Sequence, residues 1–226
     1  MKKSAILSFA ALAVLSLPAF GDDLPITAEQ QKALTPDAVH TNLMEGNERY
    51  VAGEQSVRGI KAAAGGQFPQ AVILSCLDSR VPVEDVFDQG IGDIFVGRVA
   101  GNVENVDQLG SMEFAAGAAG VKLVMVLGHE ACGAVKGACD NVELGNLTRL
   151  LEKIKPAINS VEGYEESERN SRNTEFVNKV IEANVRQTVA DIRKRSEVLA
   201  GMEKEGKIKI AGATCSLQDG SVTLLD

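Results

Sequence analysis

Five residues in two short blocks of this chain could build a metal site. Cys76, Asp78 and Arg80 lie close together in the first block, and His129 and Cys132 stand three residues apart in the second, about fifty residues later. Two thiolates and one imidazole form a zinc ligand set, and three protein ligands on a tetrahedral ion leave its fourth position open to water. The two blocks therefore predict a catalytic rather than a structural zinc site.

A carboxylate and a guanidinium accompany the first cysteine. Asp78 and Arg80, two residues apart, can pair through charge-assisted hydrogen bonds. Such a pair would keep Asp78 ionised, ready to accept a hydrogen bond from a water on the zinc or to bind the zinc itself. Zinc lowers the pKa of its water from 15.7 to roughly 7, so these groups together are suited to producing hydroxide at neutral pH.

Each block taken alone has a simpler explanation. A histidine satisfied inside the core explains a His-x-x-Cys pattern more often than a metal does, although this chain has only two histidines. The other, His40, lies in a polar helical segment and is explained by surface exposure or helix packing. In the first block, Cys76 could end a strand, followed by Asp78 as a helix N-cap and Arg80 on the surface. The combination of both blocks favours the metal site.

Both blocks begin where an apolar run ends. Residues 70–75, 93–97 and 121–127 are short apolar runs, which predict strands buried on both faces. In an open α/β sheet, ligands bind beyond the carboxyl ends of the strands. We therefore expect two separate strands to deliver Cys76 and the pair of His129 and Cys132 to the same edge of the sheet.

The rest of the chain alternates helical and extended patterns. Helical spacing is present over 27–55 (with a start at Pro36 and an interruption at 45–47), 109–120, 147–158 and 175–195, and strands over 207–213 and 221–225 flank a turn at 218–220. This alternation predicts an α/β fold with a central, mostly parallel β-sheet flanked by helices. The acidic stretch 162–173 is expected to be a solvated loop or helix end, and the basic residues 193–195 a solvated helix end.

The first residues of the chain indicate its location, and its net charge indicates which partners it excludes. Two lysines, an apolar run and small residues are typical of a secretory signal, so residues 1–21 are expected to be cleaved and 22–226 to form one domain. The mature protein would be periplasmic or secreted, without a later membrane-spanning segment. A net charge of −8 argues against binding to nucleic-acid phosphates.

Export raises the question of disulfide bonds, because the chain has four cysteines. Cys76 and Cys132 are explained as metal ligands, and a bound metal would protect them from oxidation. Cys139 and Cys215 remain. We favour two free, buried thiols at these positions, and the alternative is a bridge between them.

The two blocks together resemble the β-class carbonic anhydrases. Cys-x-Asp-x-Arg followed by His-x-x-Cys-Gly is specific to that family, and segments 45–50, 67–69, 78–82, 109–114 and 128–135 also agree with it. The resemblance runs from about residue 38 to the C-terminus. It implies an α/β fold, Zn²⁺ as cofactor, and an obligate homodimer or a tetrameric dimer of dimers, joined through N-terminal helices and sheet edges.

The resemblance also implies roles around the metal. Zn²⁺ would be held by Cys76, His129 and Cys132. Asp78 would be a fourth ligand in a closed, inactive form and would swing to Arg80 in the open form. These two residues are the expected catalytic pair.

A small CO₂ pocket is implied beside the metal. Gln67 of the neighbouring subunit would surround it together with Phe95 and Phe114, and Gly133 would bring a backbone N–H near the substrate. These four residues are the expected substrate-binding set.

Four positions depart from the family pattern without touching a zinc ligand. Phe114 stands where Tyr is common, Val99 where Asn is commoner, Cys215 where Tyr is usual, and Ile73 where one subgroup carries Trp. Phe114 leaves the pocket apolar but removes a hydroxyl. Because Trp is missing at position 73 and Tyr at position 215, we expect no inhibition by bicarbonate at a second pocket.

The activity that the resemblance implies is the reversible hydration of CO₂ to bicarbonate and a proton by a zinc lyase. Two thiolates donate more negative charge to zinc than imidazoles would, so we expect activity to rise above neutral pH. Carbonyl sulfide or carbon disulfide is an alternative substrate for the same site. A non-catalytic zinc or thiol protein is the other alternative, since it would not require Asp78 or Arg80.

Overall fold

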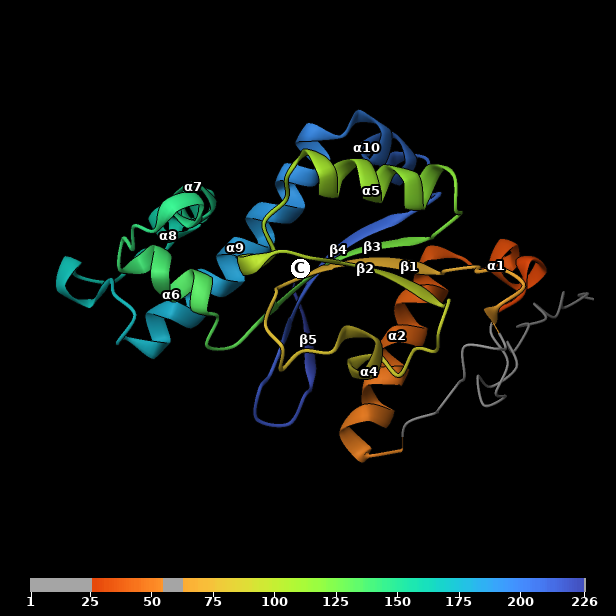
Figure 1. Ribbon diagram of the computed structural model, residues 1–226, viewed down its shortest axis with the longest axis horizontal. Helices are drawn as coiled ribbons and strands as arrows, with labels where there is room; N and C mark the ends of the chain where they lie inside the picture. The colour runs from red at the N-terminus through yellow and green to blue at the C-terminus, as the bar shows by residue number, and fades with distance from the viewer. Residues whose placement is uncertain (1–25, 55–62, 226) are drawn as a thin grey trace, which may run out of the picture.

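A five-stranded sheet between helices forms the centre of the molecule (Figure 1). The computed structural model describes residues 26–54 and 63–225, so the expected signal segment lies outside the described residues. The strand order is β2-β1-β3-β4-β5. All neighbours are parallel except β4 and β5, which are antiparallel. The predicted α/β fold with a mostly parallel central sheet is confirmed.

The five strands match the five runs that predicted them. They are β1 (Ala71–Ser75), β2 (Ile94–Arg98), β3 (Leu123–His129), β4 (Lys209–Cys215) and β5 (Val222–Leu225). β1 and β3 are buried at every position because helices cover both faces at the sheet centre, whereas the edge strand β2 is mostly half-buried. Continuous apolar sequence is what such doubly covered strands require.

Helices on the two faces enclose two apolar cores. On one face the sheet packs against α2 (Pro36–Ala52) and α4 (Val83–Val86), with α1 (Ala28–Ala33) beside them. The opposite face packs against α5 (Val106–Gly117), α9 (Thr174–Arg195) and α10 (Glu197–Lys204). No helix of the described residues has both the length and the apolar character to cross a membrane.

A third core lies beyond the carboxyl ends of the strands. It includes Cys76 and Cys132 and is formed with the first half of α9 and three short helices, which Figure 1 shows projecting to one side of the sheet. These are α6 (Gly133–Cys139), α7 (Gly145–Glu152) and α8 (Lys155–Ser160). Two 3-10 turns, Ala100–Asn102 and Glu166–Glu168, complete the described elements.

The predicted interruption of the first long helix is wrong. α2 runs unbroken through Gly46 and Asn47. A Cβ at Gly46 would lie 1.9 Å from the carbonyl oxygen of Phe87, so only glycine allows α2 to approach that backbone. The Asn47 amide donates to the carbonyls of Val86 and Gly220, at 2.9 Å each. The Gly-Asn pair therefore fastens α2 to the rest of the fold.

The basic end of α9 is exposed, as its composition predicted, but two of its cations are also ion-paired. Arg193 donates to both carboxylate oxygens of Glu203, at 2.7 and 2.9 Å, and Arg195 pairs with Glu104. Local sequence could not show these partners, since Glu104 lies 91 positions away from Arg195. The predicted helix over 147–158 is divided into α7 and α8, with Pro156 in the first turn of α8.

Candidate functional site

Cys76, His129 and Cys132 meet at the carboxyl ends of β1 and β3. These strands are neighbours in register, with Ser75 opposite Leu127, so the residue after β1 lies beside the end of β3. One side-chain ligand atom from each of the three residues lies within 4.8 Å of the others, and all three residues are buried. The prediction that two strands bring these residues to one edge is confirmed.

The spacing within this cluster suits a tetrahedral metal. The two sulfur atoms are 3.9 Å apart, and two thiolates bound to one zinc at about 2.3 Å in tetrahedral geometry would stand about 3.8 Å apart. The turn between His129 and Cys132 passes through Ala131 at φ +53°, a left-handed conformation uncommon outside glycine. This turn points Cys132 back toward His129.

The imidazole of His129 presents a free nitrogen to the cluster. Its Nδ1 lies 2.8 Å from the carbonyl oxygen of Glu130, a contact in which the ring nitrogen donates. Its Nε2 is buried with no hydrogen-bond partner among the described residues. Metal-binding histidines typically donate one ring N–H to a carbonyl and offer the other nitrogen to the ion. A buried polar atom left in this state fits a metal ligand.

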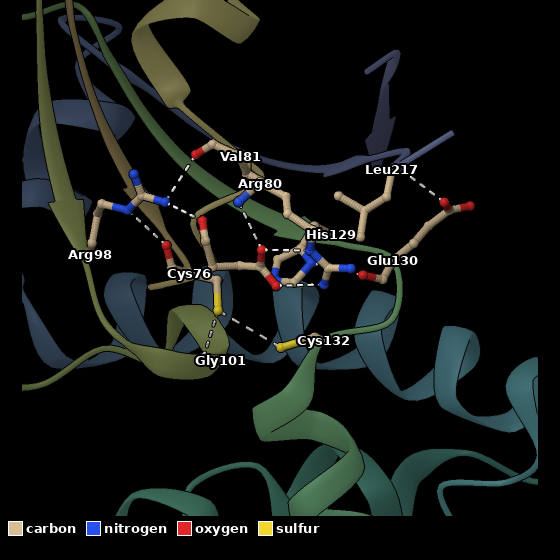
Figure 2. A network of polar contacts seen from close by, with 10 residues as sticks. Cys76, Arg80, Val81, Arg98, Gly101, His129, Glu130, Cys132 and Leu217 are labelled. Atoms are coloured by element: carbon tan, nitrogen blue, oxygen red, sulfur yellow. Dashed lines mark hydrogen bonds and ion pairs between the residues drawn. The ribbon is translucent and has the colours of Figure 1, made fainter. Parts of the chain in front are cut away.

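Backbone N–H groups surround both sulfur atoms. Cys76 Sγ accepts from the N–H of Gly101 at 3.3 Å (Figure 2), and Asn184 on α9 holds the carbonyl of that glycine at 2.8 Å. The backbone N–H groups of Ala134 and Val135 act to lower the pKa of Cys132. Such donors stabilise negative charge on sulfur, which is the form that binds metals.

The two thiols affect one another's ionisation. The contact with Cys132, followed by the neighbouring imidazole of His129 and nearby backbone N–H groups, lowers the pKa of Cys76 to about 4 despite its burial. The same contact, together with burial, raises the pKa of Cys132. Burial alone would lower the pKa of His129, but the thiolate of Cys76 and other neighbours raise it. Without a metal, the site holds one thiolate, one thiol and one imidazole. A divalent cation would displace the proton of the thiol, because cysteine binds metals as the thiolate.

Asp78 is paired with Arg80 beside the cluster. Its carboxylate accepts hydrogen bonds from Arg80 Nε at 2.9 Å, from Nη2 at 2.7 Å and from the backbone N–H at 3.0 Å. These contacts hold the pKa of Asp78 well below its usual range. Asp78 Oδ2 is also 3.8 Å from His129 Nε2. Asp78 is thus held by Arg80 and does not cap a helix, because the N-cap of α4 is Pro82.

Phe95 and Phe114 lie together on the outer side of β2. Their ring centroids are 6.4 Å apart, and they line a pocket of about 370 Å³ that also includes Arg98. Gly133 is the exposed first residue of α6, directly after Cys132. Phe95 is the second residue of β2 and pairs in register with Val72, three positions before the carboxyl end of β1.

Gln67 of the same chain does not join this group. It is exposed and packs beside Gly92, which precedes the amino end of β2, whereas the cluster lies at the carboxyl ends of the strands. The expectation placed Gln67 of a neighbouring subunit in the pocket, and a single chain does not test it.

Three supporting residues were missed by the sequence analysis: Arg98, Gly101 and Asn184. Arg98 donates to the backbone carbonyls of Cys76 and Val81, at 3.0 Å each, and to that of Asp78. A charged residue at the carboxyl end of a strand beside the first block was the signal that could have found it. Asn184 lies on a helix over eighty positions from its partner, so no local pattern revealed it.

The remaining thiols and the second histidine lie outside the cluster. Cys139 and Cys215 are free and buried, as predicted. Burial raises the pKa of each thiol to about 11, so both stay protonated. His40 is partly buried on α2, and burial lowers its pKa. These groups have no part in the metal site.

Comparison with known proteins identifies the family. The family described as carbonic anhydrase matches residues 71–222. The chain is 39% identical over 201 residues to carbonic anhydrase 2 of Mycobacterium tuberculosis, with 84% of this chain and 93% of that protein aligned. A β-carbonic anhydrase structure from Aspergillus fumigatus matches at 26% identity and a TM-score of 0.62, covering 84% of this chain and 89% of the other. The chain belongs to the β-class carbonic anhydrases.

A further structural match agrees on the fold. One of the tetrameric β-carbonic anhydrases from Sordaria macrospora has a TM-score of 0.64 at 21% identity, over 82% of this chain and 93% of that chain. The matched family region, 71–222, contains the whole cluster with Asp78 and Arg80, and it begins after Gln67. This carbonic anhydrase is therefore an enzyme whose candidate metal ligands lie within its family region.

Proposed function

We propose that this carbonic anhydrase catalyses the reversible hydration of CO₂ to bicarbonate and a proton with Zn²⁺ held by Cys76, His129 and Cys132. The observation that carries the proposal is the buried cluster of these three residues, with sulfur atoms 3.9 Å apart and an unpartnered imidazole nitrogen. Membership of the family supports the reaction. The choice of zinc follows from the donor set, since two thiolates and one imidazole suit that ion.

Bound Zn²⁺ would supply a Lewis acid that makes hydroxide available near neutral pH. The protein would contribute an oriented hydrogen-bond acceptor, the carboxylate of Asp78. Because Arg80 keeps the pKa of Asp78 low, that carboxylate stays ionised at working pH and can accept a hydrogen bond at the open side of the cluster. Arg80 thereby holds Asp78 out of the ligand set.

The substrate would reach the cluster through an apolar wall. Phe95 and Phe114 offer ring surfaces suited to CO₂, which carries no charge. The exposed N–H of Gly133 would contact an oxygen of substrate or product, and Gln67 of a partner subunit would close the pocket. Replacing Phe114 by Tyr would test this wall, because a hydroxyl added there should change KM more than kcat.

Metal analysis combined with stopped-flow CO₂ hydration tests the function. We expect about one zinc per chain and a rate that rises above neutral pH, and a parallel assay with carbonyl sulfide compares the substrates directly. A preparation that binds zinc but hydrates only carbonyl sulfide would contradict the proposed substrate. A chain that binds no zinc at all would contradict the metal site.

The proposal includes a homodimer or tetramer. β2 is an edge strand, and Phe114, whose ring lies against that of Phe95 on this strand, is 60% exposed. An open sheet edge with an exposed apolar side chain beside it is suited to a subunit interface. Light scattering after size exclusion should give a mass of two or four chains, and Phe114→Glu should lower it. A monomer at micromolar concentration would contradict this assembly.

We also propose export of a single domain, residues 22–226, to the periplasm or the medium after cleavage near Gly21. The support is the sequence of the first residues, with a basic start, an apolar run and small residues. N-terminal sequencing of the protein recovered from a periplasmic extract should begin near Asp22. An intact Met1 in the cytoplasmic fraction would contradict export.

A further inference from the structure

The loop between β1 and α4 carries the chemistry, and within it Asp78 is bonded to Arg80 and Val81. It contains Cys76, Asp78 and Arg80 and follows no helix or strand pattern before α4 begins at Val83. Leu77, within it, is 67% exposed. A loop so placed must be held from outside if its carboxylate is to stay in one position.

Arg98 provides that hold from the neighbouring strand. It ends β2 and pairs in register with Ser75, the last residue of β1. Its Nε donates to the carbonyl of Cys76 and its Nη2 to that of Val81, at 3.0 Å each (Figure 2). Nη2 also donates to the carbonyl of Asp78. A planar guanidinium presents its donors in a fixed fork, so these contacts fix three carbonyls relative to one strand.

The position of this loop decides what Asp78 can bind. Arg80 holds the side chain of Asp78, whereas Arg98 holds its backbone. Asp78 Oδ2 is already 3.8 Å from His129 Nε2, so a small movement of the loop would bring the carboxylate among the metal ligands. Two different arginines thus oppose that movement.

We propose that Arg98 is a positioning residue of the metal site, which keeps the Cys76–Val81 loop in place and so keeps the Asp78 carboxylate from occupying the open metal position. The inference rests on the proposed function, in which Cys76, His129 and Cys132 hold the metal. Arg98 acts through the loop backbone and needs no contact with CO₂.

The test uses the full-length mature protein with Co²⁺ in place of Zn²⁺. Thiocyanate is the probe, because this anion binds cobalt only where no protein ligand stands, and the visible spectrum reports the change in coordination. The variants are Arg98→Met, which retains an unbranched apolar stem but no donors, and Arg98→Lys, which has a cation without the fork. CO₂ hydration is measured on the zinc forms.

Arg169→Met is the matched control. Arg169 is not a member of the metal cluster. It donates to the carbonyls of Val161 and of Ile158 in α8, at 2.7 and 2.6 Å, and its guanidinium lies over the ring of Phe176. The control therefore removes the same kind of contact, and thermal unfolding of both variants separates general loss of stability from an effect on the metal site.

We expect Arg98→Met to weaken thiocyanate binding and to lower kcat/KM, each by about 10- to 100-fold, as is typical when a partner that orients metal ligands is removed. Arg98→Lys should lie between Arg98→Met and the wild type, which keeps the test decisive if Arg98→Met does not fold. Adding Arg80→Gln to the Arg98 variant should cause little further loss, because both changes release Asp78.

Wild-type thiocyanate affinity and spectrum in the folded Arg98 variants would overturn the inference. An equal loss in Arg169→Met would also overturn it, since the effect would then be one of stability. If the wild-type cobalt protein itself neither binds thiocyanate nor hydrates CO₂, the proposed function fails. That result is seen in the wild type alone, whereas the inference about Arg98 is judged by comparing the variants with the wild type.

Discussion

At the scale of single residues, the site depends on which groups hold charge and what holds them. The thiolate of Cys76 is stabilised by the backbone N–H of Gly101, and the carboxylate of Asp78 by Arg80. The sequence predicted the charged groups themselves, because their types and spacing are visible locally. It could not predict Gly101 as a donor, since a backbone N–H leaves no mark in a sequence.

Asp78→Asn should lower kcat/KM by about 100-fold or more, because an amide neither carries the negative charge nor pairs with Arg80 as the carboxylate does. Stopped-flow CO₂ hydration measures the loss. Asp107→Asn, at an exposed position in the first turn of α5, is the control and should hydrate CO₂ like the wild type. Full activity in Asp78→Asn would remove this carboxylate from the reaction.

Gly101→Ala should weaken zinc binding by about 10- to 100-fold, as measured by competition with a chelator. The residue has φ +73°, and a Cβ there would lie 2.8 Å from Ile154 Cδ1, so the N–H would move away from Cys76 Sγ. Gly145→Ala has a positive φ with open space around it and is the matched control. Equal zinc affinity in the two variants would show that this N–H does not support the thiolate.

At the scale of elements, apolar runs predicted all five strands, whereas contacts between elements set the helix boundaries and ends. The Gly46-Asn47 pair looks like a break in a helix, yet α2 passes through it because another backbone lies against it. The exposed cations at the end of α9 also bind Glu203 and Glu104, which their composition did not reveal. In both cases the partner that decides the local structure is distant in sequence.

Gly46→Ala should destabilise the protein by about 2 kcal/mol, because the new Cβ would overlap the Phe87 carbonyl in a packed interface. Gly110→Ala, in α5 with open space at its Cβ, should instead raise stability by about 0.5–1 kcal/mol through helix propensity. Chemical denaturation of both variants measures the difference. Similar shifts for the two would contradict the close approach of α2.

Glu203→Gln should destabilise the protein by about 1–2 kcal/mol at pH 7, a value reduced for the partial exposure of the pair. Burial alone would raise the pKa of Glu203, but Arg193 and the N–H of Ile210 outweigh it and lower the pKa. The carboxylate therefore contributes stability above its unfolded-state pKa, and this contribution is lost as pH falls through the folded-state pKa. Urea unfolding at pH 7 and in acid should show the difference shrinking, and a constant difference would contradict the assignment.

At the scale of the whole molecule, parallel strands converge at one edge, and this convergence is what the sequence could predict best. Two motifs at strand ends were enough to place Cys76 beside His129 and Cys132. The third core, built by α6, α7, α8 and the first half of α9, covers the sulfur ligands from the side. Its arrangement could not be predicted, because short amphipathic helices do not specify their partners.

The central claim is that one zinc ion is held by two sulfur atoms and one nitrogen atom from Cys76, Cys132 and His129. X-ray absorption at the zinc edge of the purified mature protein tests it most directly. The account predicts two sulfur neighbours at about 2.3 Å and nitrogen or oxygen neighbours at about 2.0–2.2 Å. A zinc shell without sulfur, or one with four sulfur atoms, would contradict it.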